Sequence, residues 1–310
     1  MSQEINREAS ALDKLTTEAI DPDLMNIDAM DTESRLRVIN AEDAKVSLAV
    51  ETQIPQIARA VHRAAHSLRV GGRLIYIGAG TSGRLGVLDA AECPPTFGVT
   101  PAMVQAVIAG GRDAMFEAVE GAEDDSEAGA AAVIEGDIGP NDTIVGISAS
   151  GRAPFVVGAL RQAKKRGAAT VAVTNNHPSE LEAIASITIA AVVGPEVLAG
   201  STRMKSGTAQ KMVLNMISTG AMMEIGKTYG NLMVDVQATN TKLRARAARI
   251  VSQVTGCSMD KAESVLASAD GSAKVAIVMI ESDKTPDEAR KLIDDNGGFL
   301  RKALGAAGLR

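Results

Sequence analysis

The sequence predicts an α/β fold, a parallel sheet flanked by helices, with a small helical module at its C-terminal end. Short apolar segments of strand length alternate with segments whose apolar residues recur at helical spacing, which is typical of a parallel sheet covered on both faces. The first apolar segment ends in a glycine turn that leads directly into a helix. Of the 310 residues, 45% are hydrophobic and 23% are charged, which suits a globular protein with one substantial core.

The individual elements follow from this spacing in chain order. Residues 40–68 predict a kinked helix or two helices, because apolar residues recur at helical spacing, Pro55 interrupts them and a pair of glycines ends them. A strand at 73–77 precedes the glycine turn. Further strands are predicted at 104–109, 143–147, 170–173 and 187–193, and further helices at 83–91, 124–134, 154–165, 179–185 and 202–227.

The last part of the chain predicts a compact helical module without evident chemistry. It contains three short amphipathic segments, the last of which is broken by a pair of glycines. These segments lie at 259–268, 273–280 and 286–303. We therefore expect three parts: an N-terminal helical arm at 1–62, an α/β domain at 63–236 and the helical module at 237–310.

Composition excludes several classes of function. Aromatic residues make up 2% of the chain and tryptophan is absent, so stacking on nucleobases is a poor interpretation, and the net charge of −6 offers no global attraction for nucleic acid. Two cysteines and three histidines argue against a disulfide framework or a metal centre. The first residues do not show the basic region and apolar core of a signal peptide, and no apolar run is long enough to cross a bilayer. We expect a cytoplasmic protein that contacts neither nucleic acid nor membrane.

Three loops combine glycine with hydroxyl side chains. Such loops can hold a phosphate through backbone N–H groups, hydroxyls and a helix N-terminus, without an overall basic surface. Because the carboxyl ends of parallel strands meet at one edge of the sheet, we expect the loops to converge on one crevice and to bind a phosphomonoester. The candidate residues are Gly80, Thr81 and Ser82 in the first loop, Ser148, Ser150 and Gly151 in the second, and Thr202, Arg203 and Lys205 in the third.

Other interpretations of these loops stay open. Gly78, Gly80 and Gly83 satisfy the G-x-G-x-x-G pattern of a dinucleotide site, although the next strand ends without the acidic residue that would hold a ribose. A single Ser-Gly loop is usually a helix cap, and the nearby arginines, Arg84 and Arg152 among them, can form structural ion pairs.

Residues 78–98 resemble the signature of the N-acetylmuramic acid 6-phosphate etherase family. Further resemblance lies at 109–111 with 119–124, at 200–211 and at 230–235, so it spans nearly the whole chain. A similar protein, the sugar-phosphate-binding regulator of glucokinase, provides the alternative of a non-catalytic regulator of the same fold.

The resemblance implies a SIS (sugar isomerase) fold, a homodimer and a carbon–oxygen lyase. The expected reaction cleaves the lactyl ether of N-acetylmuramic acid 6-phosphate to N-acetylglucosamine 6-phosphate and D-lactate, in amino-sugar catabolism and peptidoglycan recycling. The resemblance places the proton donor of the family at Glu92 and its second catalytic glutamate at Glu123.

These residue types suit that reaction. In the open-chain sugar a base can remove the C2 proton, which lies next to a carbonyl, while an acid protonates the departing lactate oxygen; water then adds to the alkene, and neither metal nor cofactor is needed. At the expected end of a helix, the negative dipole end favours a protonated Glu92, whereas the positive end at the expected start of 124–134 favours an ionised Glu123. His177 can open the sugar ring, although a loop histidine is more often a cap or a solvated residue.

Overall fold

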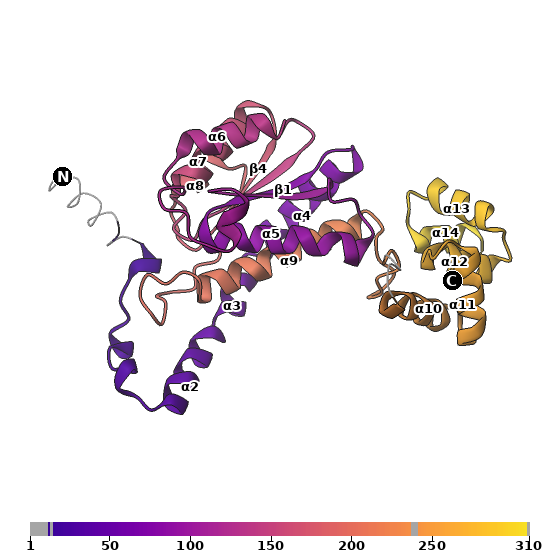
Figure 1. Ribbon diagram of the computed structural model, residues 1–310, viewed down its shortest axis with the longest axis horizontal. Helices are drawn as coiled ribbons and strands as arrows, with labels where there is room; N and C mark the ends of the chain where they lie inside the picture. Colours follow the sequence, from indigo (N-terminus) through magenta and orange to yellow (C-terminus); the bar gives the residue numbers. More distant parts are fainter. Residues whose placement is uncertain (1–11, 13–14, 237–240, 309–310) are drawn as a thin grey trace. The chain divides into compact units, whose positions relative to one another are not determined.

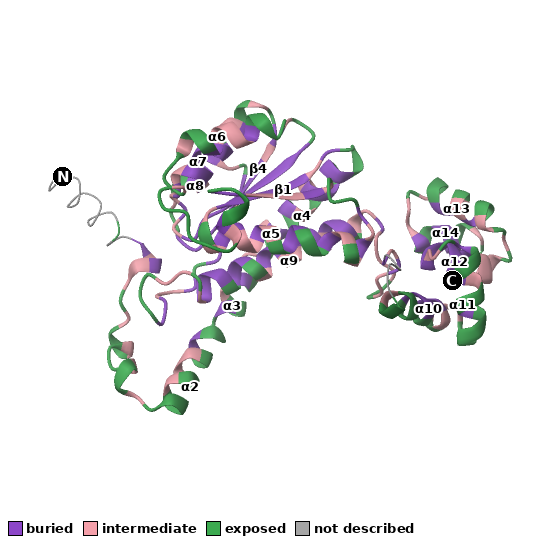
Figure 2. Cartoon of the chain, viewed as in Figure 1, coloured by how far each residue is buried: buried purple, intermediate pink, exposed green. Residues whose placement is uncertain are grey.

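The computed structural model describes residues 12, 15–236 and 241–308 (Figure 1). It contains one sheet of five parallel strands in the order β2-β1-β3-β4-β5, which confirms the predicted parallel sheet flanked by helices. The strands are β1 (Leu74–Gly78), β2 (Val104–Ile108), β3 (Thr143–Ile147), β4 (Ala169–Thr174) and β5 (Ile187–Ala190). Figure 2 shows that the strands are largely buried, as expected of a sheet with both faces covered.

Helices precede, connect and follow these strands. The α-helices are α2 (Thr32–Asp43), α3 (Val46–Glu51), α4 (Ile54–Arg69), α5 (Gly80–Phe97), α6 (Ser126–Glu135), α7 (Pro154–Lys165), α8 (Glu180–Ile184), α9 (Lys205–Glu224), α10 (Thr241–Thr255), α11 (Met259–Ser268), α12 (Ala273–Ser282), α13 (Pro286–Asp295) and α14 (Leu300–Ala306). Four 3-10 turns are η1 (Thr16–Glu18), η2 (Pro22–Leu24), η3 (Ile27–Ala29) and η4 (Arg112–Met115). Of these helices, none in the described part of the chain is long and apolar enough to cross a membrane.

The prolines confirm one sequence-based expectation and contradict another. The predicted interruption at Pro55 is confirmed, since α3 ends at Glu51 and α4 begins at Ile54 with Pro55 in its first turn, where proline needs no intrahelical N–H partner. Pro94 and Pro95 were expected to end a helix before them, but α5 continues through both to Phe97. Gly98 follows with a φ of +64°, a conformation that suits glycine at a helix end.

Alternate side chains of β1 face the two helical layers. Ile75 and Ile77 join the core beneath α6 and α7, while the Tyr76 hydroxyl on the other face donates to Asp89 Oδ2 in α5 at 2.8 Å. A Cβ at Gly86 would lie 2.9 Å from Tyr76 Cβ, so glycine lets α5 approach the sheet closely. In Figure 1, α6, α7 and α8 lie on one side of the sheet, and α4 and α5 lie on the other.

Two compact units make up the chain. The first contains residues 1–90 and 104–218, including the whole sheet, and the second contains residues 91–103 and 219–310. The second unit has its own core, to which α10–α14 contribute residues such as Val251, Ile277 and Leu300. The expected division at residues 62 and 236 stays a prediction.

Candidate functional site

A polar cavity of about 600 Å³ lies in the first unit, where β1 and β3 end. It is lined by two of the three expected phosphate loops and by part of the third. Seven of the residues singled out in the sequence line it: Gly80, Thr81, Ser82, Glu123, Ser148, Ser150 and Thr202. Gly151, Arg203, Lys205 and Glu92 are not among the lining residues.

The first loop brings the N-terminus of α5 to the cavity. Gly80 begins this helix with a φ of +51°, and the first N–H groups of a helix have no partner within it. Buried Ser82 donates its hydroxyl hydrogen to Gln210 Oε1 at 2.9 Å. The start of the helix therefore offers N–H donors suited to an anion, and the hydrogen bond to Gln210 fixes the Ser82 side chain.

The second loop is braced by its own serines. Ser148 Oγ accepts from the Gly151 N–H at 3.1 Å, and Ser150 Oγ accepts from the Arg152 N–H at 3.3 Å. Gly151 has a φ of +70°, and a Cβ there would lie 2.5 Å from Ser179 Cβ. Gly151 thus shapes the loop, whereas Ser148 and Ser150 line the cavity.

The two basic residues of the third loop lie away from the cavity wall. Lys205 is buried, and its Nζ lies 2.8 Å from Glu42 Oε2. Arg203 is exposed. The start of α9 is instead capped by Glu196, whose carboxylate accepts from the backbone N–H groups of Lys205 and Ser206, each at 2.9 Å. Arg152 is the basic residue that lines the cavity.

Glu123 lies just before α6 and is held through its backbone. Its carbonyl accepts from the Phe155 N–H at the start of α7 at 2.9 Å. The two helices approach closely, since a Cβ at Gly129 would lie 1.9 Å from the Phe155 carbonyl oxygen. A side chain at Gly129 would displace α7 and therefore move the backbone that holds Glu123.

The electrostatics of Glu123 differ from the sequence-based expectation. Glu123 is an exposed residue, but partial desolvation, and then the negative charge of Asp124, raise the pKa of its carboxyl above its ordinary value. The expected helix did not begin at Asp124: α6 begins at Ser126 with Asp125 as its N-cap, so Glu123 lies outside the helix. A raised pKa brings a general base closer to the working pH, which favours efficient proton transfer.

Glu92 lies in the second unit and is exposed. Because α5 extends to Phe97, Glu92 occupies the body of the helix and not its last turn. Glu92 is therefore not at the negative end of the helix dipole, where a protonated carboxyl was expected. Its assignment as proton donor depends on the family resemblance.

Cavity residues from two places were not predicted from the sequence. Leu12, Leu15 and Glu18 enter from the N-terminal segment, and Asp124 follows Glu123. The N-terminal residues belong to no glycine loop and no motif, so only the tertiary structure identifies them. His177 is not a lining residue; it is exposed, and its Nδ1 lies 3.0 Å from Glu182 Oε2 at the start of α8.

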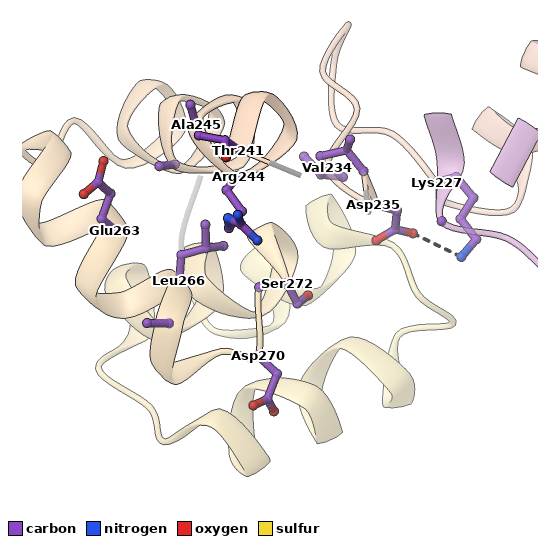
Figure 3. A pocket seen from close by; sticks show the side chains of 15 residues that line it. Lys227, Val234, Asp235, Thr241, Arg244, Ala245, Glu263, Leu266, Asp270 and Ser272 are labelled. Atoms are coloured by element: carbon purple, nitrogen blue, oxygen red, sulfur yellow. Dashed lines mark ion pairs between the residues drawn. The ribbon is translucent and has the colours of Figure 1, made fainter. Parts of the chain in front are cut away.

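A second cavity, of about 860 Å³, lies within the C-terminal unit (Figure 3). Val234 and Leu266 contribute apolar surface, Arg244 contributes a guanidinium, and Lys227 pairs with Asp235 at 3.2 Å. Across the described residues, no group of three or more histidine, cysteine, aspartate or glutamate side chains is arranged to hold a metal ion.

Comparison with known proteins first identifies the class. Residues 126–219 match the SIS domain family, and residues 56–164 match the N-terminal SIS domain of glucokinase regulatory protein. Residues 230–270 match the C-terminal lid domain of that regulatory protein. A solved structure of phosphoheptose isomerase from Neisseria gonorrhoeae has 16% identity and a TM-score of 0.46, covering 62% of this chain and 98% of its own. The two family matches, and not this structural likeness, identify the SIS domain of the chain.

Curated relatives then identify the family. An N-acetylmuramic acid 6-phosphate etherase of Clostridium beijerinckii is 53% identical over 297 residues, covering 96% of this chain and 98% of the relative. The etherase of Brucella anthropi is also 53% identical, covering 96% of this chain and 97% of the relative. The chain belongs to the N-acetylmuramic acid 6-phosphate etherase family.

The pKa of Glu123 leads to a stability prediction. As the pH rises, Glu123 ionises in the unfolded chain before it ionises in the folded protein, so the folded protein loses stability over that range. We expect Glu123→Gln to raise the free energy of unfolding slightly at neutral pH, because glutamine carries no charge to desolvate and the exposed Glu123 is only partly desolvated. The gain should disappear below the ordinary glutamate value of 4.5. Denaturant unfolding followed by circular dichroism measures both.

Glu127→Gln is the matched control for this prediction. Glu127 lies in the first turn of α6, where the helix dipole favours a negative charge, so this variant should be slightly less stable at neutral pH. A loss of stability in Glu123→Gln at neutral pH would contradict the desolvation of Glu123.

Proposed function

We propose that this protein cleaves the lactyl ether of N-acetylmuramic acid 6-phosphate, as a carbon–oxygen lyase, to N-acetylglucosamine 6-phosphate and D-lactate. The observation that carries the proposal is the joint lining of one cavity by the expected phosphate loops and by Glu123. Relatives with this name match nearly the full chain at 53% identity, which favours the etherase over a non-catalytic regulator of the same fold.

The phosphate is proposed to bind at the N-terminus of α5 and the loop after β3. Thr81, Ser148 and Ser150 supply hydroxyl groups there, while Ser82 lines the cavity with its hydroxyl hydrogen bonded to Gln210. Gly80 begins the helix whose first N–H groups have no partner within it. Thr202 adds a hydroxyl from the third loop. Arg152 supplies the positive charge that Lys205, paired with Glu42, does not.

Elimination followed by hydration is the proposed reaction. Glu123 removes the C2 proton of the open-chain sugar, and its raised pKa makes it a stronger base than an ordinary glutamate. Glu92 donates a proton to the lactate oxygen as the C3–O bond breaks. Water then adds at C3 of the alkene and a proton returns to C2, so the sum of the two steps is hydrolysis of the ether.

The family resemblance also suggests a homodimer that works in peptidoglycan recycling, and the sequence pattern predicts a cytoplasmic location. Leu36, Leu48 and Ile54 on α2, α3 and α4 are 58%, 62% and 45% exposed, which supports a surface covered by a second copy. Sedimentation of micromolar protein tests this point, and a monomer at every concentration would contradict it.

Loss of the base should abolish lactate release. We expect Glu123→Gln to lower the rate of D-lactate formation from N-acetylmuramic acid 6-phosphate by about 10²–10⁴-fold, while affinity for the phosphosugar changes little, because the base acts on C2 and not on the phosphate. A coupled lactate assay and calorimetric titration measure the two quantities. Glu127→Gln, whose residue does not line the cavity, should retain turnover. Near-normal turnover in Glu123→Gln would remove Glu123 from the mechanism.

Removal of a phosphate contact should weaken binding instead. We expect Ser150→Ala to reduce affinity for N-acetylglucosamine 6-phosphate by roughly 1.5–3 kcal/mol, about tenfold or more, because a hydrogen bond to a charged group is lost. Calorimetric titration measures the change. Ser264→Ala is the control, since Ser264 is exposed on α11. Equal affinity in the two variants would contradict the proposed phosphate site.

A further inference from the structure

One carboxylate enters the cavity from an element that no motif marks. Glu18 ends the 3-10 turn η1 and lines the cavity together with Leu15 of the same segment. More than sixty residues of chain separate this segment from the first phosphate loop at Gly80, so the approach of Glu18 to the site is a product of tertiary packing.

Asn176 fixes this segment to the second phosphate loop. Its Oδ1 accepts from the Thr16 N–H at 2.7 Å, and its Nδ2 donates to Thr17 Oγ1 at 2.9 Å. The same Nδ2 donates to the Ala149 carbonyl oxygen at 2.9 Å, between Ser148 and Ser150. Thr17 and Asn176 are only 1% and 2% exposed. Buried, paired groups of this kind hold one geometry, because breaking a pair leaves an unsatisfied polar group.

Gly200 holds the same segment from the third loop. Its N–H donates to the Thr17 carbonyl oxygen at 3.2 Å. A Cβ at Gly200 would lie 3.0 Å from Glu18 Oε2, so the carboxylate packs directly against this glycine. Glu18 is therefore held in place by residues on two of the three loops that surround the cavity.

The proposed reaction requires one more proton transfer, the opening of the sugar ring, besides those proposed for Glu92 and Glu123. N-acetylmuramic acid 6-phosphate is a cyclic hemiacetal, and its C2 proton becomes acidic only after the ring opens to the aldehyde. Ring opening needs a group that takes the proton of the O1 hydroxyl. Besides Glu123 and its neighbour Asp124, the lining residue with a carboxylate is Glu18. His177 lies outside the cavity lining and contacts Glu182.

We propose that Glu18 catalyses the opening of the sugar ring, an inference that rests on the proposed function. Glu18 takes the proton from the O1 hydroxyl, the C1–O1 bond becomes a carbonyl, and the C1–O5 bond breaks with its electron pair moving to O5. O5 takes a proton from water, and Glu18 returns its proton to water. No proton is gained or lost overall, and the aldehyde is ready for removal of the C2 proton by Glu123.

Ring opening can be measured without ether cleavage. N-acetylglucosamine 6-phosphate has no lactyl group, and its α and β anomers interconvert only through the open chain. We expect the full-length wild-type protein to accelerate this interconversion, followed by exchange NMR, about 10²-fold or more above the rate in buffer. Glu18→Gln should return the rate to that of buffer, with affinity for the sugar phosphate within about threefold of wild type.

The control is Glu135→Gln, a change of the same kind at an exposed residue that ends α6 and does not line the cavity; it should retain the full acceleration. Acceleration that survives in Glu18→Gln, or a wild-type protein that does not accelerate anomer interconversion, would overturn the proposal. Lactate release by the wild-type protein is measured separately. Its absence would refute the etherase function, whereas its presence with either of those NMR results would refute only the role of Glu18.

Discussion

A buried chain of hydrogen bonds beneath the cavity determines where the loops of the site lie. Ser82 donates to Gln210 Oε1, Gln210 Nε2 donates to Asn175 Oδ1 at 3.0 Å, and Asn175 Nδ2 donates to the Ala191 carbonyl oxygen at 2.8 Å. The chain joins the start of α5, the first half of α9 and the ends of β4 and β5. Because each member is at least nine-tenths buried, a shift of any one element would leave a polar group without a partner. The positions of the hydroxyls around the cavity follow from this network.

One basic side chain, that of Arg152, is among the residues that line this cavity. The chain has a net charge of −6, and Lys205 is paired with Glu42, so the groups that the cavity offers to an anion are hydroxyls, the N–H groups at the start of α5 and Arg152. In the same cavity, desolvation together with the negative charge of Asp124 raises the pKa of Glu123. The cavity proposed to bind the phosphate therefore also contains a carboxylate whose raised pKa suits a base.

The sequence predicted the sheet and the converging loops because both follow from local patterns. Strand-length apolar runs and Gly-Ser turns are local, and the parallel sheet brings their ends together. The predicted end of α5 was wrong, because this helix continues through Pro94 and Pro95. The predicted direction of the Glu123 pKa shift was wrong as well, because it depends on where α6 begins and on which groups are desolvated. Glu18 was missed for a related reason: its place in the cavity depends on Asn176 and Gly200, which lie far from it in the chain.

Heavy-oxygen water tests the central claim, that the ether is cleaved by elimination at C2 and C3, most directly. Cleavage of N-acetylmuramic acid 6-phosphate in H₂¹⁸O, followed by mass spectrometry of both products, shows which carbon–oxygen bond breaks. Elimination and hydration place the label in the 3-hydroxyl of the sugar and leave lactate unlabelled. Label in lactate would mean that water attacks the lactyl carbon, and the roles given to Glu123 and Glu92 would then be wrong.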